Sequence, residues 1–182
     1  MKKLFIMLLV FSLCSMFALA DDTTWTFDSD EEGWNNGGWS TTISHDSVEG
    51  HDAAGAIDCT DTDGYYGVRN TVTIGASDPN YTIEAWCKLV SLPGGTATGG
   101  LNLDTWDLDT SGATSVPFDD SVTDSWQSQT QSGTADSTAS GYIMIWGGAS
   151  GESGDSHTVQ YYLDDISYTE GSRVIDWGLY QE

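Results

Sequence analysis

The segment 161–168 constrains the fold of this chain more than any other stretch. It reads Tyr-Tyr-Leu-Asp-Asp-Ile-Ser-Tyr, with aromatic and β-branched residues around two adjacent acids. This composition predicts a β-strand, in which successive side chains point to opposite faces. Asp165 would then share a face with Leu163, and Asp164 would share the other face with Ile166. One carboxylate must therefore face a packed interior or its rim, where it needs a cation or several hydrogen-bond donors.

The charge balance limits what that cation can be. The chain has 28 acidic residues against five Lys and Arg, a formal net charge of −23. Because basic side chains are so scarce, a metal ion is the economical partner for a buried carboxylate. The negative charge argues against nucleic acid and against anionic membrane surfaces as partners. It is compatible with calcium binding, with a saline habitat, or simply with keeping a protein soluble.

The first 20 residues predict a secretory signal peptide. A positively charged Met-Lys-Lys is followed by an apolar core that ends at Phe17 and by the small-residue sequence Ala-Leu-Ala that ends at Ala20. The core is too short to span a bilayer well. We therefore expect a secreted, extracellular protein with a signal peptide at 1–20, one β-domain at 21–170 and a C-terminal tail at 171–182.

Two cysteines would remain after cleavage, Cys59 and Cys87. An oxidising compartment permits a disulfide between them. Each follows a predicted inward-facing position, Ile57 and Ala85, so the two could meet across a core. The alternative is that they are two separate buried thiols.

The remainder of the chain predicts an all-β fold. No window shows sustained helical periodicity, and short apolar-polar alternations are separated by turns rich in Gly, Asp and Ser. This pattern is typical of a sandwich or barrel. The predicted strands are Thr24–Phe27, Trp39–Ser44, Ala54–Asp58, Tyr66–Val72, Tyr81–Leu89, Gly100–Trp106, Ser125–Thr130, Gly141–Trp146 and Gln160–Thr169.

Four segments resemble, in the same order, the motifs of carbohydrate-binding modules of the family four and nine type, which have a galactose-binding-like fold. The segments are the Trp-Thr-Phe-Asp…Gly-Trp opening at 25–34, the Tyr-x-x-x-x-Trp-x-Lys strand at 81–88, the Asp-Ser-Trp at 124–126 followed by 141–147, and the closing Tyr-Leu-Asp-Asp-Ile-Ser at 162–167. The resemblance implies a β-sandwich jelly roll of two antiparallel sheets. It also implies a structural calcium that bridges the first and last strands.

In that family picture the metal ligands are Asp28, near the start of the chain, and Asp164, near its end, with Asp165 as a further candidate. Calcium takes six to eight oxygen ligands, so other groups must complete its shell. Candidates follow His45, namely Asp46, Glu49 and Gly50. The alternative is that the paired acids cap turns or accept backbone N–H bonds.

Alternation within the predicted strands also sorts side chains by face and predicts a sugar-binding surface. Aromatic planes stack on the apolar faces of sugar rings, while charged and amide groups bind the hydroxyls. One sheet would present both kinds of side chain, and the resemblance implies that it is the concave one. The alternative is that the aromatics pack under loops or against the tail. The predicted carbohydrate-binding residues are Arg69, Glu84, Trp86, Lys88, Asn102, Asp104, Trp106, Tyr142 and Trp146.

No motif supports catalysis. The three histidines are scattered without a zinc spacing, and no Gly-x-Ser-x-Gly elbow is present. A glycosidase would need a specific carboxylate pair, which nothing singles out. We therefore expect a non-catalytic protein that binds a polysaccharide such as β-glucan or xylan, with a structural calcium. The alternative is a self-associating subunit of an extracellular matrix, surface layer or filament, assembled through the tail at 171–182.

Overall fold

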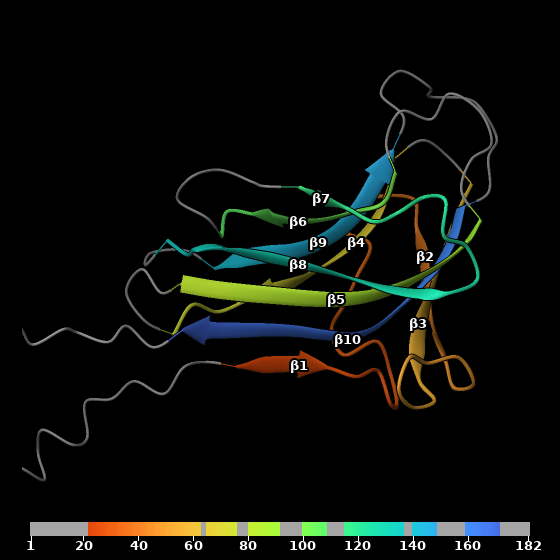
Figure 1. The fold of residues 1–182 in the computed structure, drawn as a ribbon, viewed down its shortest axis with the longest axis horizontal. Helices are drawn as coiled ribbons and strands as arrows, with labels where there is room; N and C mark the ends of the chain where they lie inside the picture. Colours follow the sequence, from red (N-terminus) through yellow and green to blue (C-terminus); the bar gives the residue numbers. More distant parts are fainter. Residues whose placement is uncertain are drawn as a thin grey trace, which may run out of the picture.

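A computed structural model describes residues 22–62, 65–75, 80–91, 100–108, 115–136, 140–148 and 159–171. Within these ranges the chain forms ten β-strands and no helix (Figure 1). None of the described residues forms a helix that could cross a membrane. The predicted signal peptide and all of the predicted tail except Gly171 lie outside the described residues.

The strands form two antiparallel sheets, as the family resemblance implies. The six-stranded sheet has the order β2-β3-β10-β5-β8, with β1 also pairing with β10. The four-stranded sheet has the order β4-β9-β6-β7. The strands of the six-stranded sheet are β1 (Thr23–Trp25), β2 (Thr42–Asp46), β3 (Ala56–Asp61), β5 (Asn80–Ser91), β8 (Trp126–Thr134) and β10 (Val159–Gly171). Those of the four-stranded sheet are β4 (Tyr65–Val72), β6 (Asn102–Trp106), β7 (Val116–Pro117) and β9 (Gly141–Gly148).

Each of the nine predicted strands overlaps an observed one. The largest offset is in β8, which ends at Thr134 rather than Thr130. The strand β2 begins at Thr42 rather than Trp39, because the residues before it form a loop. The strand that the sequence does not predict is β7, which has two residues and is too short to show an alternation.

The core lies between the two sheets and follows the period of two. On β5 every second residue is fully buried, and β6 and β9 contribute matching positions from the opposite sheet. Burial of these apolar side chains is the main stabilising contribution to the sandwich. The central core residues include Ile57, Ile83, Leu89, Leu103, Ile143, Ile145 and Leu163.

A β-bulge interrupts β10 at the acidic pair. The register against β5 shifts between Asp164 and Ser167, so that two residues of β10, Asp165 and Ile166, stand opposite the single residue Ala85. Asp165 has a φ of 44°, in the left-handed region. Asp tolerates that conformation better than most residues, and bulges accommodate one extra residue in this way.

The bulge overturns the predicted assignment of faces. Uninterrupted alternation would place Ile166 on the face opposite Leu163, yet both side chains are fully buried in the core. The extra residue reverses the alternation, because side chains change face at every position. Asp164 and Asp165 therefore both lie away from the core centre. Asp164 is nevertheless buried, because a loop covers it.

The predicted disulfide is wrong, and the alternative of two buried thiols is confirmed. Cys59 on β3 is paired with Tyr161 and Cys87 on β5 is paired with Leu163, so β10 runs between the two cysteines. Two strand spacings of about 4.8 Å each exceed the separation that a disulfide can bridge. Burial raises the pKa of both thiols above the ordinary value.

Candidate functional site

The predicted sugar-binding residues lie on two different sheets. Glu84, Trp86 and Lys88 belong to β5, which pairs with β10 and β8 and not with β9. The prediction of one continuous face is therefore wrong, since outward-facing residues of the two sheets point in opposite directions. Six of the nine residues do share the outer face of the four-stranded sheet, namely Arg69, Asn102, Asp104, Trp106, Tyr142 and Trp146.

The register of β4, β9 and β6 orders this outer face, which we call the aromatic face, into three rows. The rows are Gly67, Trp146 and Asn102; then Arg69, Met144 and Asp104; then Thr71, Tyr142 and Trp106. Within a row, neighbouring side chains lie about 5 Å apart across the strands, close enough for direct contact.

The indole of Trp146 is held in place on the aromatic face. Its Nε1 donates a hydrogen bond to Asp104 Oδ2 at 2.9 Å. The same carboxylate accepts bonds from the Ser115 hydroxyl at 2.7 Å and from the backbone N–H of Thr105 at 2.7 Å. Gly67 leaves room for the tryptophan, because a Cβ there would lie 2.6 Å from the Cβ of Trp146. Asp104 therefore orients the Trp146 indole, and its carboxylate oxygens are already hydrogen-bonded within the protein.

Tyr142 packs against the Arg69 guanidinium, whereas Trp106, in the same row, has an exposed indole. The Cζ atom of Arg69 lies 4.3 Å from the centroid of the Tyr142 ring, which is a cation–π contact. The guanidinium therefore covers one face of Tyr142. Trp106 is 59% exposed, so its indole is available to a ligand.

Tyr65 is a further aromatic residue on this face that the sequence analysis missed. It is 49% exposed and lies opposite Gly148 at the end of β4. The predicted strand began one residue later, at Tyr66. Extending the alternation back from Arg69 by four positions would have found Tyr65, because it has the same parity.

The outer face of the six-stranded sheet is covered by the loop that joins β2 to β3, residues 47–55. The His51 ring stacks on Trp86 with centroids 3.6 Å apart and meets Trp126 edge-on at 5.9 Å. Lys88 Nζ donates to Glu49 Oε2 at 2.8 Å. Trp86 and Lys88 therefore have partners within the protein, which fits the alternative that aromatics pack under loops. Glu84 lies further along β5, opposite Thr130 and Ser167.

The acidic pair lies under the same loop. Asp164 accepts the backbone N–H of His51 at 2.7 Å and that of Asp165 at 2.8 Å. Burial raises the pKa of the Asp164 carboxyl to about 6. Asp165 Oδ2 lies 2.9 Å from His51 Nδ1, and Asp52 Oδ1 lies 3.5 Å from that nitrogen.

The donors that gather here differ in part from the predicted ligand set. His51, Asp52 and Asp165 each offer an atom within 4.8 Å of the others. Asp28 is exposed and accepts the Thr26 hydroxyl, and it does not belong to this cluster. It does lie beside the base of the loop, because a Cβ on Gly55 would be 2.9 Å from the Cα of Asp28. The carboxylates suit calcium, which prefers oxygen ligands, whereas the imidazole nitrogen does not.

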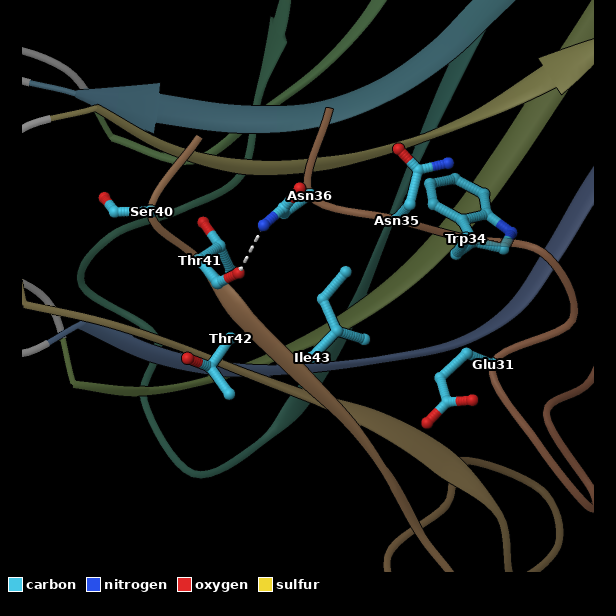
Figure 2. Close-up of a pocket in the computed structure, with 8 residues that line it drawn as sticks. All are labelled: Glu31, Trp34, Asn35, Asn36, Ser40, Thr41, Thr42 and Ile43. Carbon is cyan, nitrogen blue, oxygen red and sulfur yellow. Dashed lines mark hydrogen bonds between the residues drawn. The ribbon is translucent and has the colours of Figure 1, made fainter. Parts of the chain in front are cut away.

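A pocket of about 450 Å³ lies between the segment that follows β1 and the start of β2 (Figure 2). Asn36 Nδ2 donates across it to the Thr41 carbonyl at 3.2 Å, and the Ser40 and Thr41 hydroxyls donate to Asp61. Much of its polar lining is thus bonded within the protein. The lining residues are Glu31, Trp34, Asn35, Asn36, Ser40, Thr41, Thr42 and Ile43.

No known protein family and no curated protein matches this chain. Solved structures with a similar fold include the CBM22-1 and GH10 modules of endo-1,4-β-D-xylanase 10B from Clostridium thermocellum, complexed with xylohexaose. That match has a TM-score of 0.62 and 17% identity, and it covers 84% of this chain and 29% of the other. The CBM22-1 xylan-binding domain of Paenibacillus barcinonensis has a TM-score of 0.58 and 14% identity, covering 81% and 92%. A family 16 carbohydrate-binding module has a TM-score of 0.54 and 14% identity, covering 79% and 94%.

These neighbours confirm the predicted fold class, a β-sandwich jelly roll of two antiparallel sheets. They are carbohydrate-binding modules, as the resemblance implies, but they belong to families 22 and 16. The narrower resemblance to families four and nine is not confirmed. This chain spans less than a third of the xylanase structure that it matches.

The contact of His51 with Trp86 gives a first testable prediction. His51→Ala removes both the stacked ring and its bond to Asp165, so we expect the free energy of unfolding in urea to fall by about 1–2 kcal/mol. Asp52→Ala, compared in metal-free protein, is the matched control, because this side chain is 82% exposed. Surface changes of that kind usually cost less than about 0.5 kcal/mol. Equal losses in the two variants would contradict the role of the imidazole ring.

Proposed function

We propose that this protein is a non-catalytic carbohydrate-binding module that holds a polysaccharide chain on the aromatic face. The observation that carries the proposal is the pairing of an open platform, Trp106, with a fixed one, Trp146, on one sheet face. Asn102 adds a side-chain amide beside Trp146 in the same row. Sugar sites combine such aromatic planes with a few placed polar groups.

The arrangement of the aromatic side chains on this face favours an extended ligand. Tyr65, Trp146 and Trp106 follow a diagonal from β4 across β9 to β6, because they lie level with Gly148, Trp146 itself and Tyr142 of the central strand. The two ends lie six positions apart along β9, at Tyr142 and Gly148, which is about 20 Å along the strand. A platform of this length suits the interior of a chain of several sugar units.

The fold neighbours support xylan as the first ligand to test. One was solved with xylohexaose and another is a xylan-binding domain. They are carbohydrate-binding modules, and one of them is joined to a GH10 module in its own chain. Our proposal is a binding role without catalysis for this chain.

Secretion is part of the proposal and rests on the sequence of residues 1–20. The rival idea of a filament subunit rests on the tail at 171–182, of which the structure describes only Gly171, and no described contact favours it.

A structural calcium at the β10 bulge is also part of the proposal. The buried Asp164, the adjacent Asp165 and the nearby Asp52 would supply carboxylate oxygens. The ion would neutralise a carboxylate pair that has no Lys or Arg partner among the described residues. It would fasten the loop 47–55 to the last strand, on the sheet opposite the aromatic face.

Substitutions on the two outer faces test the binding site. We expect Trp106→Ala and Trp146→Ala each to weaken xylohexaose binding about tenfold or more, because truncating a tryptophan at the centre of a binding surface costs about 1.4 kcal/mol or more. Trp86→Ala is the matched control on the opposite face and should leave the affinity unchanged. Calorimetric titration of folded variants measures these affinities. Loss of binding in Trp86→Ala alone would show that the site lies on the six-stranded sheet and would contradict the proposal.

The calcium proposal predicts a pH-dependent response. The raised pKa of Asp164, about 6, means that the folded protein favours the protonated acid and loses stability as the pH rises from about 4 through 6. Calcium offsets that loss only where the carboxyl is ionised. Adding calcium to metal-free protein should therefore raise the melting temperature more at pH 7.5 than at pH 5.

Variants identify the ligands in the same melting experiment. Asp165→Ala should abolish the calcium response, while Asp28→Ala should retain it, because Asp28 lies outside the donor cluster. Wild-type protein whose melting temperature ignores calcium at pH 7.5 would rule out the structural ion.

A further inference from the structure

Arg69 is unusual among the charged groups of this molecule. The described residues contain two basic side chains, Arg69 and Lys88. Lys88 forms an ion pair with Glu49 at 2.8 Å. Among the described residues, no carboxylate forms an ion pair with the Arg69 guanidinium. The chain has 28 acidic residues, so the missing carboxylate partner of Arg69 is not explained by a shortage of acidic side chains.

The Arg69 side chain is held in position without such a partner. Its guanidinium lies over Tyr142, and its stem packs against Gly37, where a Cβ would lie 2.9 Å from Nε. Gly37 has a φ of 61°, which favours glycine there. The backbone of Arg69 exchanges two hydrogen bonds with Asn35, at 2.8 and 3.0 Å. A guanidinium held in this way loses little conformational freedom when it binds a ligand.

We propose that Arg69 binds the carboxylate of a uronic acid side group on the polysaccharide, an inference that rests on the proposed function. A guanidinium is planar and presents N–H donors in a fork that matches a carboxylate. Arg69 lies on β4 in the middle row, to one side of the diagonal from Tyr65 through Trp146 to Trp106. A group bound there would branch from the polysaccharide backbone.

The charge of the whole molecule limits how acidic the ligand can be. A net charge of −23 repels a polymer with a carboxylate on every sugar. Asp104, on the other side of Met144, adds negative charge to the same face. One guanidinium can bind one carboxylate. The ligand class is therefore a neutral backbone with scattered uronic acid side groups, such as xylan that carries glucuronic acid.

The test compares two ligands that differ in one group. Calorimetric titration would use xylohexaose and the same hexasaccharide carrying a single glucuronic acid. We expect wild-type protein to bind the acidic ligand about tenfold tighter, as a charge-assisted hydrogen-bond pair provides. The advantage should shrink as salt is added, because a partly exposed pair is screened. Polygalacturonate should bind more weakly than either ligand.

Two variants of Arg69 distinguish binding of the ligand carboxylate from a structural role of the side chain. Arg69→Gln should bind both hexasaccharides with equal affinity, because the group that distinguishes the two ligands has lost its partner. Arg69→Lys retains the charge without the fork and should keep only part of the preference. Lys88→Gln, on the opposite sheet, should keep the full preference. Melting temperatures would confirm that each variant is folded.

Several outcomes would overturn the inference. If wild type binds both hexasaccharides equally well, Arg69 does not bind the uronic acid carboxylate, although the proposed function stands. If Arg69→Gln loses affinity for both ligands by the same factor, Arg69 only supports the aromatic face or binds neutral sugar. Tighter binding of polygalacturonate would contradict the charge argument. If no glycan binds wild type at all, the proposed function itself has failed.

Discussion

The pairing of β10 with three other strands is the constraint on which the rest of the structure depends. Along one edge β10 pairs first with β3 and then with β1, and along its other edge it pairs with β5. These pairings join the two ends of the described chain in one sheet (Figure 1). The bulge at Asp165 lies where the neighbour changes from β3 to β1. The extra residue lets β10 bury Leu163 before the change and Ile166 after it.

Among the described residues, a loop covers Trp86 and Lys88 on the outer face of the six-stranded sheet, whereas Tyr65 and Trp106 on the outer face of the four-stranded sheet are exposed. The loop 47–55 crosses the six-stranded sheet and contacts Trp86, Lys88 and Asp164. On the four-stranded sheet, polar contacts orient the aromatic side chains without hiding them, as Asp104 does for Trp146. A covered face suits a structural role, and an open ordered face suits a ligand.

Local alternation predicted most of the strands and their buried residues, for example Ile83 on β5 and Leu103 on β6. It could not tell which sheet each strand joins. Trp86 and Trp106 look alike in the sequence, yet they lie on opposite outer faces because their strands pair with different partners. That choice depends on contacts between residues far apart in the chain, which a local pattern does not contain.

Two further features of the site also depended on information outside a single strand. The bulge at Asp165 is a register shift, visible only when β10 is aligned with β5. The stacking of His51 on Trp86 depends on the path of a loop that has no periodicity. By contrast, the sequence did suggest that one carboxylate of the pair Asp164 and Asp165 needs a special environment, because a buried carboxylate needs donors or a cation. In the structure that carboxylate belongs to Asp164. The structure supplies two backbone donors.

The central claim is that ligand binds the four-stranded sheet and leaves the six-stranded sheet untouched. The most direct measurement is a titration of ¹⁵N-labelled protein with xylohexaose, following the indole N–H signals by nuclear magnetic resonance. The account predicts that the signals of Trp106 and Trp146 shift as ligand is added and that the signal of Trp86 stays in place. A shift of Trp86 with Trp106 and Trp146 unchanged would contradict it.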